Sequence, residues 1–268
     1  DAAIRDAQES RGLGDVYKRQ HMAKADVLKR LLTGPFAHCG IRWGLTGTVP
    51  KADYEFMGLK CSIGEVANRI QASELQDKGV LANCHVNVIQ TQDHPQFKTY
   101  SEELKWLTTD TTRMTWVANT IKDIATSGNT LILVDRISAG ELLEKKIPGS
   151  VFVSGSTKNM ERKEQYDEIS TATNKVIIAT YGVAAVGINI PRIFNLVLIE
   201  PGKSFVRVIQ SIGRGIRKAE DKDSVQIWDI TSSCKFAKRH LGARKKFYKE
   251  ANYPYNIEKI NYENPYTR

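Results

Sequence analysis

The residues best suited to chemistry lie on one predicted helix, 204–216, whose polar face is basic. Its polar side chains recur every three or four residues, opposite an apolar stripe: Arg207, Gln210, Arg214 and Arg217. A guanidinium is permanently charged and can grip phosphate oxygens while negative charge develops on them, as in phosphoryl transfer. Gly213 and Gly215 each weaken the helix by about 1 kcal/mol relative to alanine, which indicates close approach of a ligand or backbone. A solvated basic face is the alternative.

Two glycine-containing loops are the next candidates. The first follows the apolar run 176–179 and combines Gly182 and Gly187 with two compact polar residues, Thr180 and Asn189. Glycine permits a ligand to approach the backbone closely. The second is the segment 44–50, GLTGTVP, where a strand end turns through small hydroxyl residues. An ordinary turn is the alternative in both places.

The surrounding pattern predicts the elements that position these loops. Short apolar strands are expected at 86–90, 131–134, 151–153, 176–179, 195–199 and 225–230. Helices are expected at 112–126, from Ser138, near 158–170, at 204–212 and at 236–251, and Ser138 with Glu141 reads as a capping box. Apolar strands between amphipathic helices predict an α/β fold with a parallel sheet covered on both faces. In such a sheet, ligands bind at the carboxyl ends of the strands.

The segment 235–249 is the most basic part of the chain. It carries seven cations and no acid, namely Lys235, Lys238, Arg239, Arg244, Lys245, Lys246 and Lys249. The aromatic residues Phe236, Phe247 and Tyr248 are interleaved with them. This combination suits neutralisation of phosphates together with stacking on bases. A solvated helix face whose aromatic rings pack on the sheet is the alternative.

Composition narrows the function classes. The 268 residues carry a net charge of +9, 41% are hydrophobic, and no apolar run reaches the roughly 18 residues that span a bilayer. A pI near 9.3 favours a polyanionic partner. The cysteines, Cys39, Cys61, Cys84 and Cys234, form no C-x-x-C pair, so we expect reduced thiols in a cytoplasmic setting and no metal site.

In this order the motifs resemble superfamily 2 helicases and translocases, particularly phage recombination helicases of the UvsW type. Gln210-Ser-Ile-Gly213-Arg214-Gly-Ile-Arg217 is similar to the family's motif six, Q-x-x-G-R-x-x-R. The segment 179–189 resembles motif five, 45–48 resembles motif three, and 131–136 resembles motif four. The segment 153–155, together with Arg162, resembles the region that follows motif four. His21 resembles the histidine that ends the family's D-E-x-H box. Position 189 departs from the pattern, because many relatives carry aspartate where this chain has Asn189.

The resemblance implies a role for each matching residue. Arg217 would be the arginine finger, Arg214 a second phosphate or interdomain contact, and Gln210 the residue that positions them. The expected nucleotide-binding residues are Gly187, Asn189 and Gly213. The residues expected to couple hydrolysis to movement are Thr46, Gly47, Thr48 and His21. The expected nucleic-acid contacts are Thr180, Arg136, Ser154 and Gly155, joined by Lys238, Arg239, Lys245 and Lys246 of the basic segment.

The resemblance also implies a domain organisation. Residues 1–20 resemble a translated sequencing-adapter tail, and 21–96 the carboxyl end of a first RecA-like motor domain with its connection. Residues 97–252 are expected to form the second RecA-like motor domain, and 253–268 a tail. The sequence contains no G-x-x-x-x-G-K-[ST] phosphate loop and no acidic pair before His21. We therefore expect ATP and Mg²⁺ to be bound only in an intact protein whose missing amino-terminal domain holds the magnesium ligands.

The expected function is that of the carboxyl-terminal part of an ATP-dependent DNA helicase. It would couple ATP hydrolysis to unwinding or remodelling of single-stranded, forked or branched DNA, as a monomer in the cytoplasm of a phage-infected bacterium. By itself the fragment is expected to be inactive. RNA remains an alternative substrate. A double-strand DNA translocase subunit of a restriction or repair system, and a non-catalytic nucleic-acid-binding domain, remain alternative functions.

Overall fold

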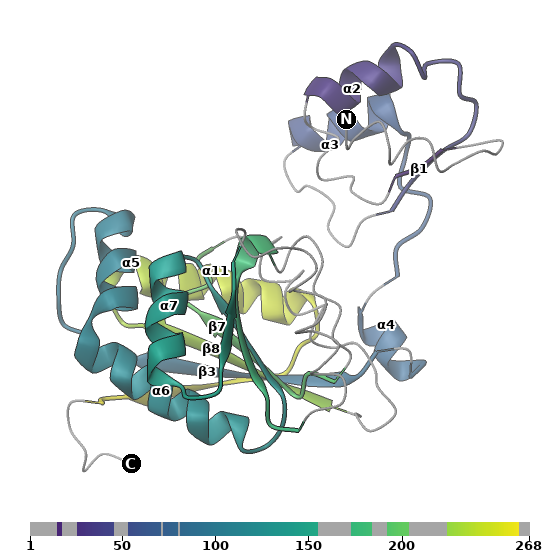
Figure 1. Ribbon diagram of the computed structural model, residues 1–268. Coiled ribbons are helices and arrows are strands. Elements are labelled where there is room, and N and C mark those ends of the chain that lie inside the picture. Colours follow the sequence, from purple (N-terminus) through teal and green to yellow (C-terminus); the bar gives the residue numbers. More distant parts are fainter. Residues whose placement is uncertain are drawn as a thin grey trace. The chain divides into compact units, whose positions relative to one another are not determined.

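The structure is a computed structural model that describes residues 15–17, 26–45, 53–70, 72–79, 81–154, 173–183, 192–203 and 224–262 (Figure 1). The chain divides into two compact units, Asp1–Ile70 and Gln71–Arg268. Each unit is described by itself below.

The first unit combines a pair of short parallel strands with two helices. These elements are β1 (Asp15–Tyr17), α2 (Asp26–Thr33), β2 (Arg42–Gly44) and α3 (Asp53–Ser62), and β1 pairs with β2. The Arg42 guanidinium donates to the carbonyls of Phe36, Ala37 and Ser62 at 2.8–3.1 Å. One half-buried cation therefore ties the turn after α2 to the end of α3. The strand β1 lies in the stretch 1–20, where the sequence predicted no element.

The second unit contains a seven-stranded sheet in the order β5-β6-β4-β7-β8-β3-β9, and every pairing in it is parallel. Its strands are β3 (Asn83–Thr91), β4 (Thr130–Val134), β5 (Val151–Val153), β6 (Val176–Thr180), β7 (Asn195–Ile199), β8 (Ser224–Ser232) and β9 (Tyr255–Ile260). Its helices are α4 (Ala72–Asp77), α5 (Tyr100–Thr109), α6 (Thr111–Ala125), α7 (Ile137–Lys146) and α11 (Lys235–Glu250). This arrangement confirms the predicted α/β fold of RecA-like type.

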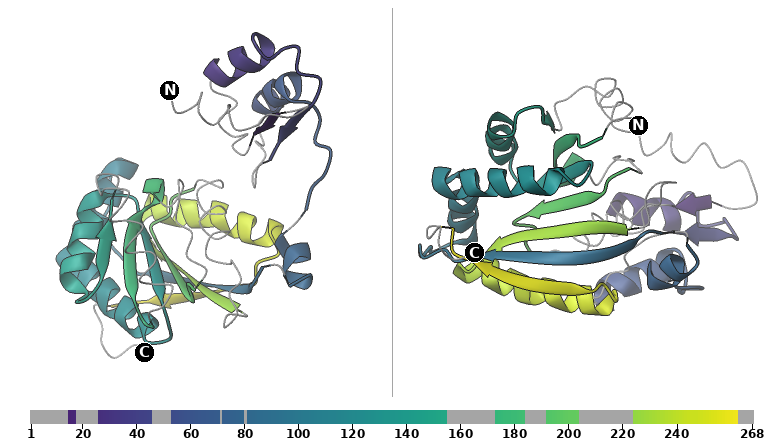
Figure 2. Two further views of the ribbon diagram at one scale, coloured as in Figure 1. Left: turned by 45° about the vertical axis from the view of Figure 1, so that its right-hand side comes forward. Right: turned by 90° about the horizontal axis from the view of Figure 1, so that it is seen from below.

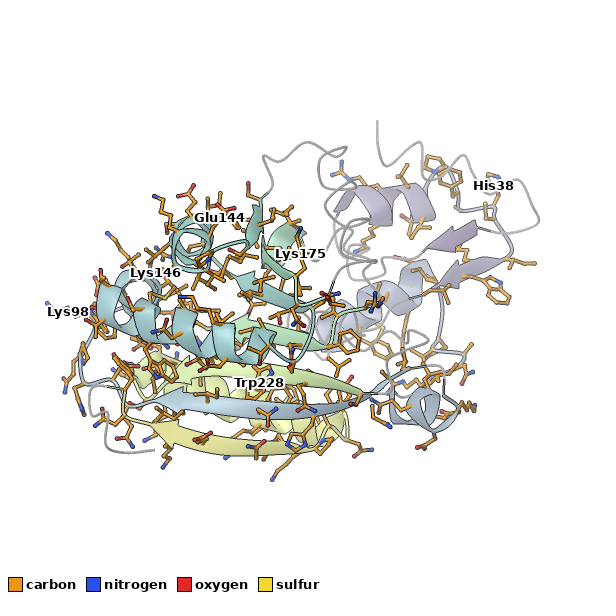
Figure 3. All side chains as sticks on the ribbon, turned by 60° about the horizontal axis from the view of Figure 1, so that its bottom comes forward. His38, Lys98, Glu144, Lys146, Lys175 and Trp228 are labelled. Carbon is orange, nitrogen blue, oxygen red and sulfur yellow. The ribbon has the colours of Figure 1, made fainter. Side chains whose placement is uncertain are left out.

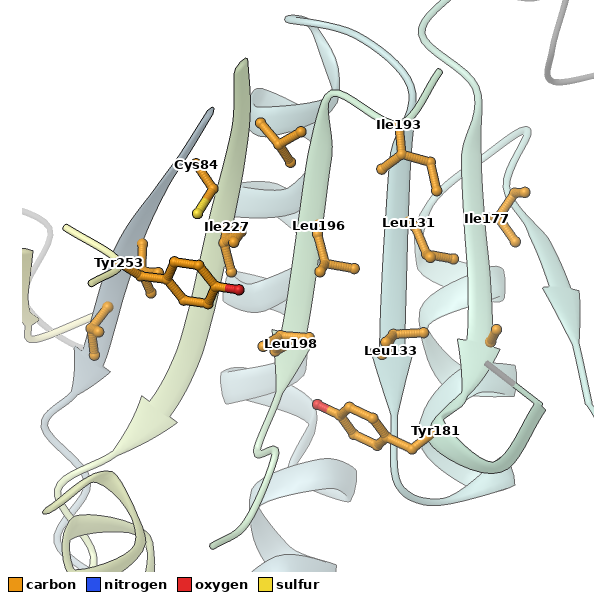
Figure 4. Packing of buried hydrophobic residues seen from close by; sticks show 14 of the residues in the cluster. Cys84, Leu131, Leu133, Ile177, Tyr181, Ile193, Leu196, Leu198, Ile227 and Tyr253 are labelled. Carbon is orange, nitrogen blue, oxygen red and sulfur yellow. The ribbon is translucent and has the colours of Figure 1, made fainter. Parts of the chain in front are cut away.

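Alternate side chains of the buried strands face opposite layers. The leucines of β4 and β7, which line up across neighbouring strands in Figure 4, pack toward α11: Leu131, Leu133, Leu196 and Leu198. The residues between them pack toward α6 and α7: Ile132, Val134, Val197 and Ile199. Helices thus cover both faces, with α11 on one side and α6 and α7 on the other (Figure 2). Such continuous apolar runs are what a sheet buried on both faces requires.

The structure corrects the predicted domain boundaries at both ends. The strand β3 was assigned to the first motor domain, but it pairs with β8 and β9 and belongs to the second unit, which begins at Gln71. Residues 255–260 were assigned to a tail, yet they form β9 at the sheet edge. Both errors have the same cause. The strands that pair here lie more than 100 residues apart in the sequence, and a local sequence pattern does not reveal such a pairing.

Helix ends in this unit are fixed by capping carboxylates and hydroxyls. Thr99 and Glu102 form a reciprocal capping box on α5, and Asp110 accepts from the Arg113 amide at the start of α6. The capping box predicted for Ser138 and Glu141 is wrong, because α7 begins at Ile137 and its cap residue, Arg136, makes no side-chain cap bond. Helix α11 takes its cap from α5, as the buried Glu103 carboxylate accepts from the amides of Phe236 and Ala237.

The edge strand β5 is anchored by a side chain of α7. The Phe152 amide donates to the Glu144 carboxylate at 2.8 Å, and Lys146 two residues later donates to Thr115 of α6 at 2.7 Å. Glu144 and Lys146 are labelled on α7 in Figure 3. The Phe152 amide, which an edge strand would otherwise leave unpaired, is therefore hydrogen-bonded within the unit.

A buried ion pair joins the sheet to α11. The Arg244 guanidinium is fully buried and binds both carboxylate oxygens of Asp229 in β8, at 2.8 and 3.0 Å. It also donates to the Gly202 carbonyl at 2.7 Å, and the Tyr248 hydroxyl donates to Asp229 at 2.8 Å. Every polar group of the pair thus has a partner, which a desolvated ion pair needs if it is to persist.

We predict that Arg244→Met lowers the free energy of unfolding by about 3–5 kcal/mol, because it leaves the Asp229 carboxylate buried without its cation. Urea unfolding of the 268-residue chain measures this. Lys246→Met is the matched control, since Lys246 lies two residues further along α11 and is exposed. Its effect should stay within about 0.5 kcal/mol. Equal losses in the two variants would contradict the assignment of Arg244 to the core.

Candidate functional site

Three of the predicted nucleic-acid contacts follow three neighbouring strands. Ser154 follows β5, Thr180 ends β6, and Arg136 follows β4. These strands are adjacent in the sheet and parallel, with Val153 opposite Ala179 and Val134 opposite Thr180. The carboxyl ends of adjacent parallel strands meet at one edge, and strands lie about 4.8 Å apart. The sheet therefore brings Ser154, Thr180 and Arg136 together at its carboxyl edge.

The three residues differ in exposure and in partners. Ser154 is 6% exposed, so it offers little surface. Thr180 is half-buried, and its hydroxyl accepts from the Val183 amide at 3.4 Å. Arg136 is half-buried and donates to the carbonyl and the hydroxyl of Ser101 at 3.2 and 3.1 Å, which holds its guanidinium against α5. Arg136 is also the cap of α7, so it lies where helix amide groups favour an anion.

Most of the predicted motor residues lie outside the described part of the chain. They are His21, Thr46, Gly47, Thr48, Gly155, Gly187, Asn189, Gln210, Gly213, Arg214 and Arg217. The strands that lead into two of these segments are described. The segment with Gly187 follows β6, and the one with Arg217 follows β7. Both strands end at the carboxyl edge.

The basic segment 235–249 is helical, and the structure separates its cations into two groups. Lys235, Lys238, Arg239, Lys246 and Lys249 are exposed, Lys245 is half-buried, and Arg244 is fully buried in its pair with Asp229. The expectation that Arg244 joins a phosphate-binding face is therefore wrong. Its position explains why, because Ala237, Leu241, Arg244 and Tyr248 recur at helical spacing on the face that packs on the sheet.

The aromatic residues of α11 are likewise engaged. Tyr248 is fully buried, which corrects the expectation that it stacks on bases. The Phe236 ring lies 6.4 Å from that of Tyr100, and the cations of Lys235 and Arg239 lie 5.5 Å from its centroid. Phe247 is half-buried. The rings of Tyr248 and Phe236 thus serve packing, the alternative that the sequence had left open.

A buried charge network at the carboxyl edge was missed by the sequence analysis. Arg113 of α6 is fully buried and lies between two carboxylates, Glu200 at 2.7 Å and Asp93 at 3.4 Å. Its guanidinium also donates to the Leu107 carbonyl, and the Thr231 hydroxyl donates to Glu200 at 3.1 Å. The network joins the ends of β3, β7 and β8 to α6. The sequence offered one indication of this network, because the charged residue Glu200 directly follows the apolar strand 195–199.

The three carboxylates near the two buried arginines are not equivalent. The Asp93 pKa lies below its usual range, because the charge of Arg113 and hydrogen bonds from Ser232, Thr91 and Tyr262 outweigh the effect of burial. Burial raises the pKa of Glu200 to about 7, although Arg113 and Arg244 oppose the rise. The charges of the two guanidinium groups are balanced by Asp93 and Asp229. Ionisation of Glu200 would therefore add an unbalanced negative charge to the buried network.

Glu200 also has an unusual backbone. Its φ is +43°, a conformation that side chains other than glycine, asparagine and aspartate seldom adopt. The Glu200 amide donates to the Ile230 carbonyl at 3.0 Å, and the Tyr181 hydroxyl donates to the carbonyl of Ile199 at 3.3 Å. The chain therefore leaves β7 along a direction fixed by β8, α6 and the turn after β6. The segment with Gln210 and Arg217 begins directly beyond this point.

Two classes of feature are absent from the described residues. No group of three or more histidine, cysteine, aspartate or glutamate side chains is arranged there to hold a metal ion. No helix in that part of the chain is long and apolar enough to cross a membrane.

Comparison with known proteins identifies a helicase domain within the chain. Residues 112–219 match the helicase conserved C-terminal domain. The chain is 26% identical over 238 residues to the ATP-dependent DNA helicase uvsW of Enterobacteria phage T4, covering 85% of this chain and 47% of that protein. The crystal structure of T4 UvsW superimposes with a TM-score of 0.59 at 20% identity, over 96% of this chain and 56% of that one. The chain thus contains a helicase C-terminal domain and is UvsW-like over most of its length.

The resemblance inferred from the motifs is thereby confirmed. The fold of this chain recurs in a fragment described as an HsdR subunit of a type I restriction enzyme from Vibrio vulnificus YJ016. That fragment superimposes with a TM-score of 0.69 at 17% identity, over 87% of this chain and 47% of that one. The chain spans less than half the length of the curated relatives it matches.

We predict that Glu200 makes the stability of the chain fall as pH rises from about 4.5 to 7. The folded state raises the Glu200 pKa from 4.5 to about 7, so folding favours the protonated form. The stabilisation is complete below pH 4.5 and is lost as pH rises through the folded pKa. Glu200→Gln removes this dependence, and its stability relative to the wild type should grow by up to about 3 kcal/mol over that range.

The measurement is urea unfolding of both proteins at a series of pH values. Glu258→Gln is the matched control, because Glu258 lies exposed on the edge strand β9. It should follow the wild type throughout. A Glu200→Gln difference that does not change with pH would contradict the predicted protonation of Glu200.

Proposed function

We propose that the chain is the carboxyl-terminal motor part of an ATP-dependent DNA helicase that unwinds or remodels forked or branched DNA. The observation that carries the proposal is the carboxyl edge of the parallel sheet. This edge gathers Ser154, Thr180 and Arg136, and β6 and β7 lead from it into the segments that resemble motifs five and six. Ligands of open α/β sheets bind at such an edge. The similarity to a phage ATP-dependent DNA helicase supports DNA as the substrate.

In this proposal the segment after β7 acts on the nucleotide. Arg217 contacts the terminal phosphate as its charge develops, Arg214 makes a second phosphate contact, and Gln210 positions both. Gly213, Gly187 and Asn189 border the nucleotide, and the small side chains let the backbone approach it. The buried network at Glu200 supports these roles, because it fixes where the chain leaves β7.

The proposed cofactor is ATP with Mg²⁺, and the chain supplies only part of its site. The sequence offers arginines for the phosphates but no G-x-x-x-x-G-K-[ST] loop to cradle them. None of the described residues forms a carboxylate group arranged for a metal ion. The phosphate loop and the Mg²⁺ ligands are therefore proposed to come from the remainder of a complete motor. In that motor, Thr46, Gly47, Thr48 and His21 would couple hydrolysis to movement.

Nucleic acid is proposed to contact the same edge. Arg136 presents a guanidinium beside the amino terminus of α7, and the Thr180 hydroxyl ends the neighbouring strand. Gly155 follows Ser154 in the sequence, and a glycine there would permit close approach of the backbone. Contacts of this kind fix the position of a strand through its phosphates and read no sequence.

The deciding experiment concerns Arg217 in the complete helicase. Arg217→Ala should lower DNA-stimulated ATP turnover by roughly 10³-fold or more while ATP binding changes little, because a finger arginine acts mainly in the transition state. Arg217→Lys should rescue poorly, since a point charge cannot reproduce the planar fork. Steady-state hydrolysis with saturating DNA measures both. The control is Lys122→Ala, which removes an exposed cation from α6. Wild-type turnover in both Arg217 variants would refute the assigned role.

A second prediction concerns the chain by itself. Without a phosphate loop, the 268-residue protein should show no DNA-stimulated ATP hydrolysis above background. The measurement is phosphate release with and without single-stranded DNA. If the chain hydrolyses ATP and Arg217→Ala abolishes that hydrolysis, the chain assembles a complete nucleotide site by itself. This result would contradict the proposal that the phosphate loop comes from the remainder of a complete motor.

A further inference from the structure

The outer face of α11 carries a continuous stripe of cations. We call it the α11 stripe, and its members are Lys235, Lys238, Arg239, Lys245, Lys246 and Lys249. At 3.6 residues per turn they fall within an arc of about 120°, opposite the buried face of the helix. At 1.5 Å per residue, the stripe is about 21 Å long. Its length corresponds to about six base pairs of B-form DNA at 3.4 Å per pair.

The positive charge of this stripe is not compensated within the described part of the second unit. None of the six side chains forms an ion pair with a carboxylate there. Asp229 and Glu103 point inward, since Asp229 binds Arg244 and Glu103 caps the helix, and the exposed Glu250 follows the stripe at the end of α11. His240 adds no charge at neutral pH, because burial and neighbouring cations lower its pKa to about 4. Six like charges along 21 Å favour a polyanion.

Two of the three aromatic rings of α11 are engaged within the unit, and the third, Phe247, is half-buried. Tyr248 is buried, and Phe236 is held between Tyr100 and the cations of Lys235 and Arg239. Proteins that hold single strands without sequence preference combine cations with exposed rings on which bases stack. The α11 stripe offers cations alone. This chemistry matches the phosphate backbone of a duplex, whose bases are already stacked inside the helix.

The stripe also lies on the far side of the sheet from Arg136. Helix α11 packs on the face formed by Leu131 and Leu196, whereas α7, which begins beside Arg136, packs on the face formed by Ile132 and Val197. Figure 2 shows the two helical layers separated by the sheet. Nucleic acid bound at α7 and nucleic acid bound along α11 are therefore different segments.

We propose that the α11 stripe binds the phosphate backbone of a double-helical DNA segment, separate from the strand held at the carboxyl edge. The inference rests on the proposed helicase function. It adds that the chain holds two DNA segments at once, one through Arg136 and its neighbours and one through α11. Such a pair of contacts suits a fork or junction, where a duplex arm lies beside an unpaired strand. Binding at the stripe reads no bases, so it is independent of sequence.

The test compares duplex with single-stranded DNA, using fluorescence anisotropy on the 268-residue chain. The probes are a labelled 30-base-pair duplex and one of its strands. Lys238→Glu combined with Lys246→Glu should lower duplex affinity on the order of tenfold or more at low salt. It should also reduce the slope of log affinity against log salt by about 2, since each lost phosphate contact contributes about 0.9. Single-strand affinity should change by less than about threefold.

Two further variants make the result specific. Lys122→Glu combined with Lys145→Glu is the matched control, because it imposes the same charge change at exposed positions of α6 and α7. It should leave duplex affinity within about threefold of wild type. Arg136→Ala should show the converse pattern to the stripe variant, with the larger loss on single-stranded DNA.

Three outcomes would overturn the proposal. They are unchanged duplex affinity in the stripe variant, equal losses on duplex and single strand, and an equal loss in the control variant. None of them depends on ATP turnover. Failure of the α11 stripe is therefore distinguishable from failure of the helicase assignment, which the Arg217 experiment decides.

Discussion

Two buried arginines hold the carboxyl edge of the sheet in place. Arg244 joins β8, α11 and the turn after β7, and Arg113 joins α6 to the ends of β3 and β7. Removing a guanidinium from water is costly, so each persists only where carboxylates and carbonyls lie close around it. Because those partners come from different elements, the requirement also fixes how the elements meet. The apolar core alone could tolerate small shifts of α6 or α11, but these arginines restrict such shifts.

The same requirement shapes the exit from β7. Glu200 accepts from Arg113 and Thr231 while its own backbone is held at a positive φ. A strained residue persists where its surroundings over-determine it, and such residues cluster at functional sites. The segment beyond Glu200 resembles motif six. The point from which the chain enters that segment is thus fixed by the buried charges around Glu200.

Sequence could predict much of this sheet, because its central strands are continuous apolar runs. The strands at 151–153 and 195–199 were predicted to the residue, and α6 and α11 to within one residue at each end. The strand β9 was missed, because YNIEKI has no continuous apolar run and its partner β3 lies more than 100 residues away in the sequence. Most of the motor residues lie outside the described chain, so the structure leaves their predicted roles untested. Arg244 was misread as a surface cation, although its spacing from Leu241 and Tyr248 already placed it on the buried face.

The position of β3 has a kinetic consequence. It is the first strand of the second unit, yet its neighbours in the sheet are β8 and β9, so Asn83 pairs with a region near Ser224 and Val86 with Tyr255. On the ribosome, β3 must wait for nearly the whole unit to be synthesised before it can pair. Closing such long loops is slow, and an unpaired strand meanwhile exposes backbone donors and acceptors. This unit is therefore expected to fold late and to need protection from aggregation while its first strand waits.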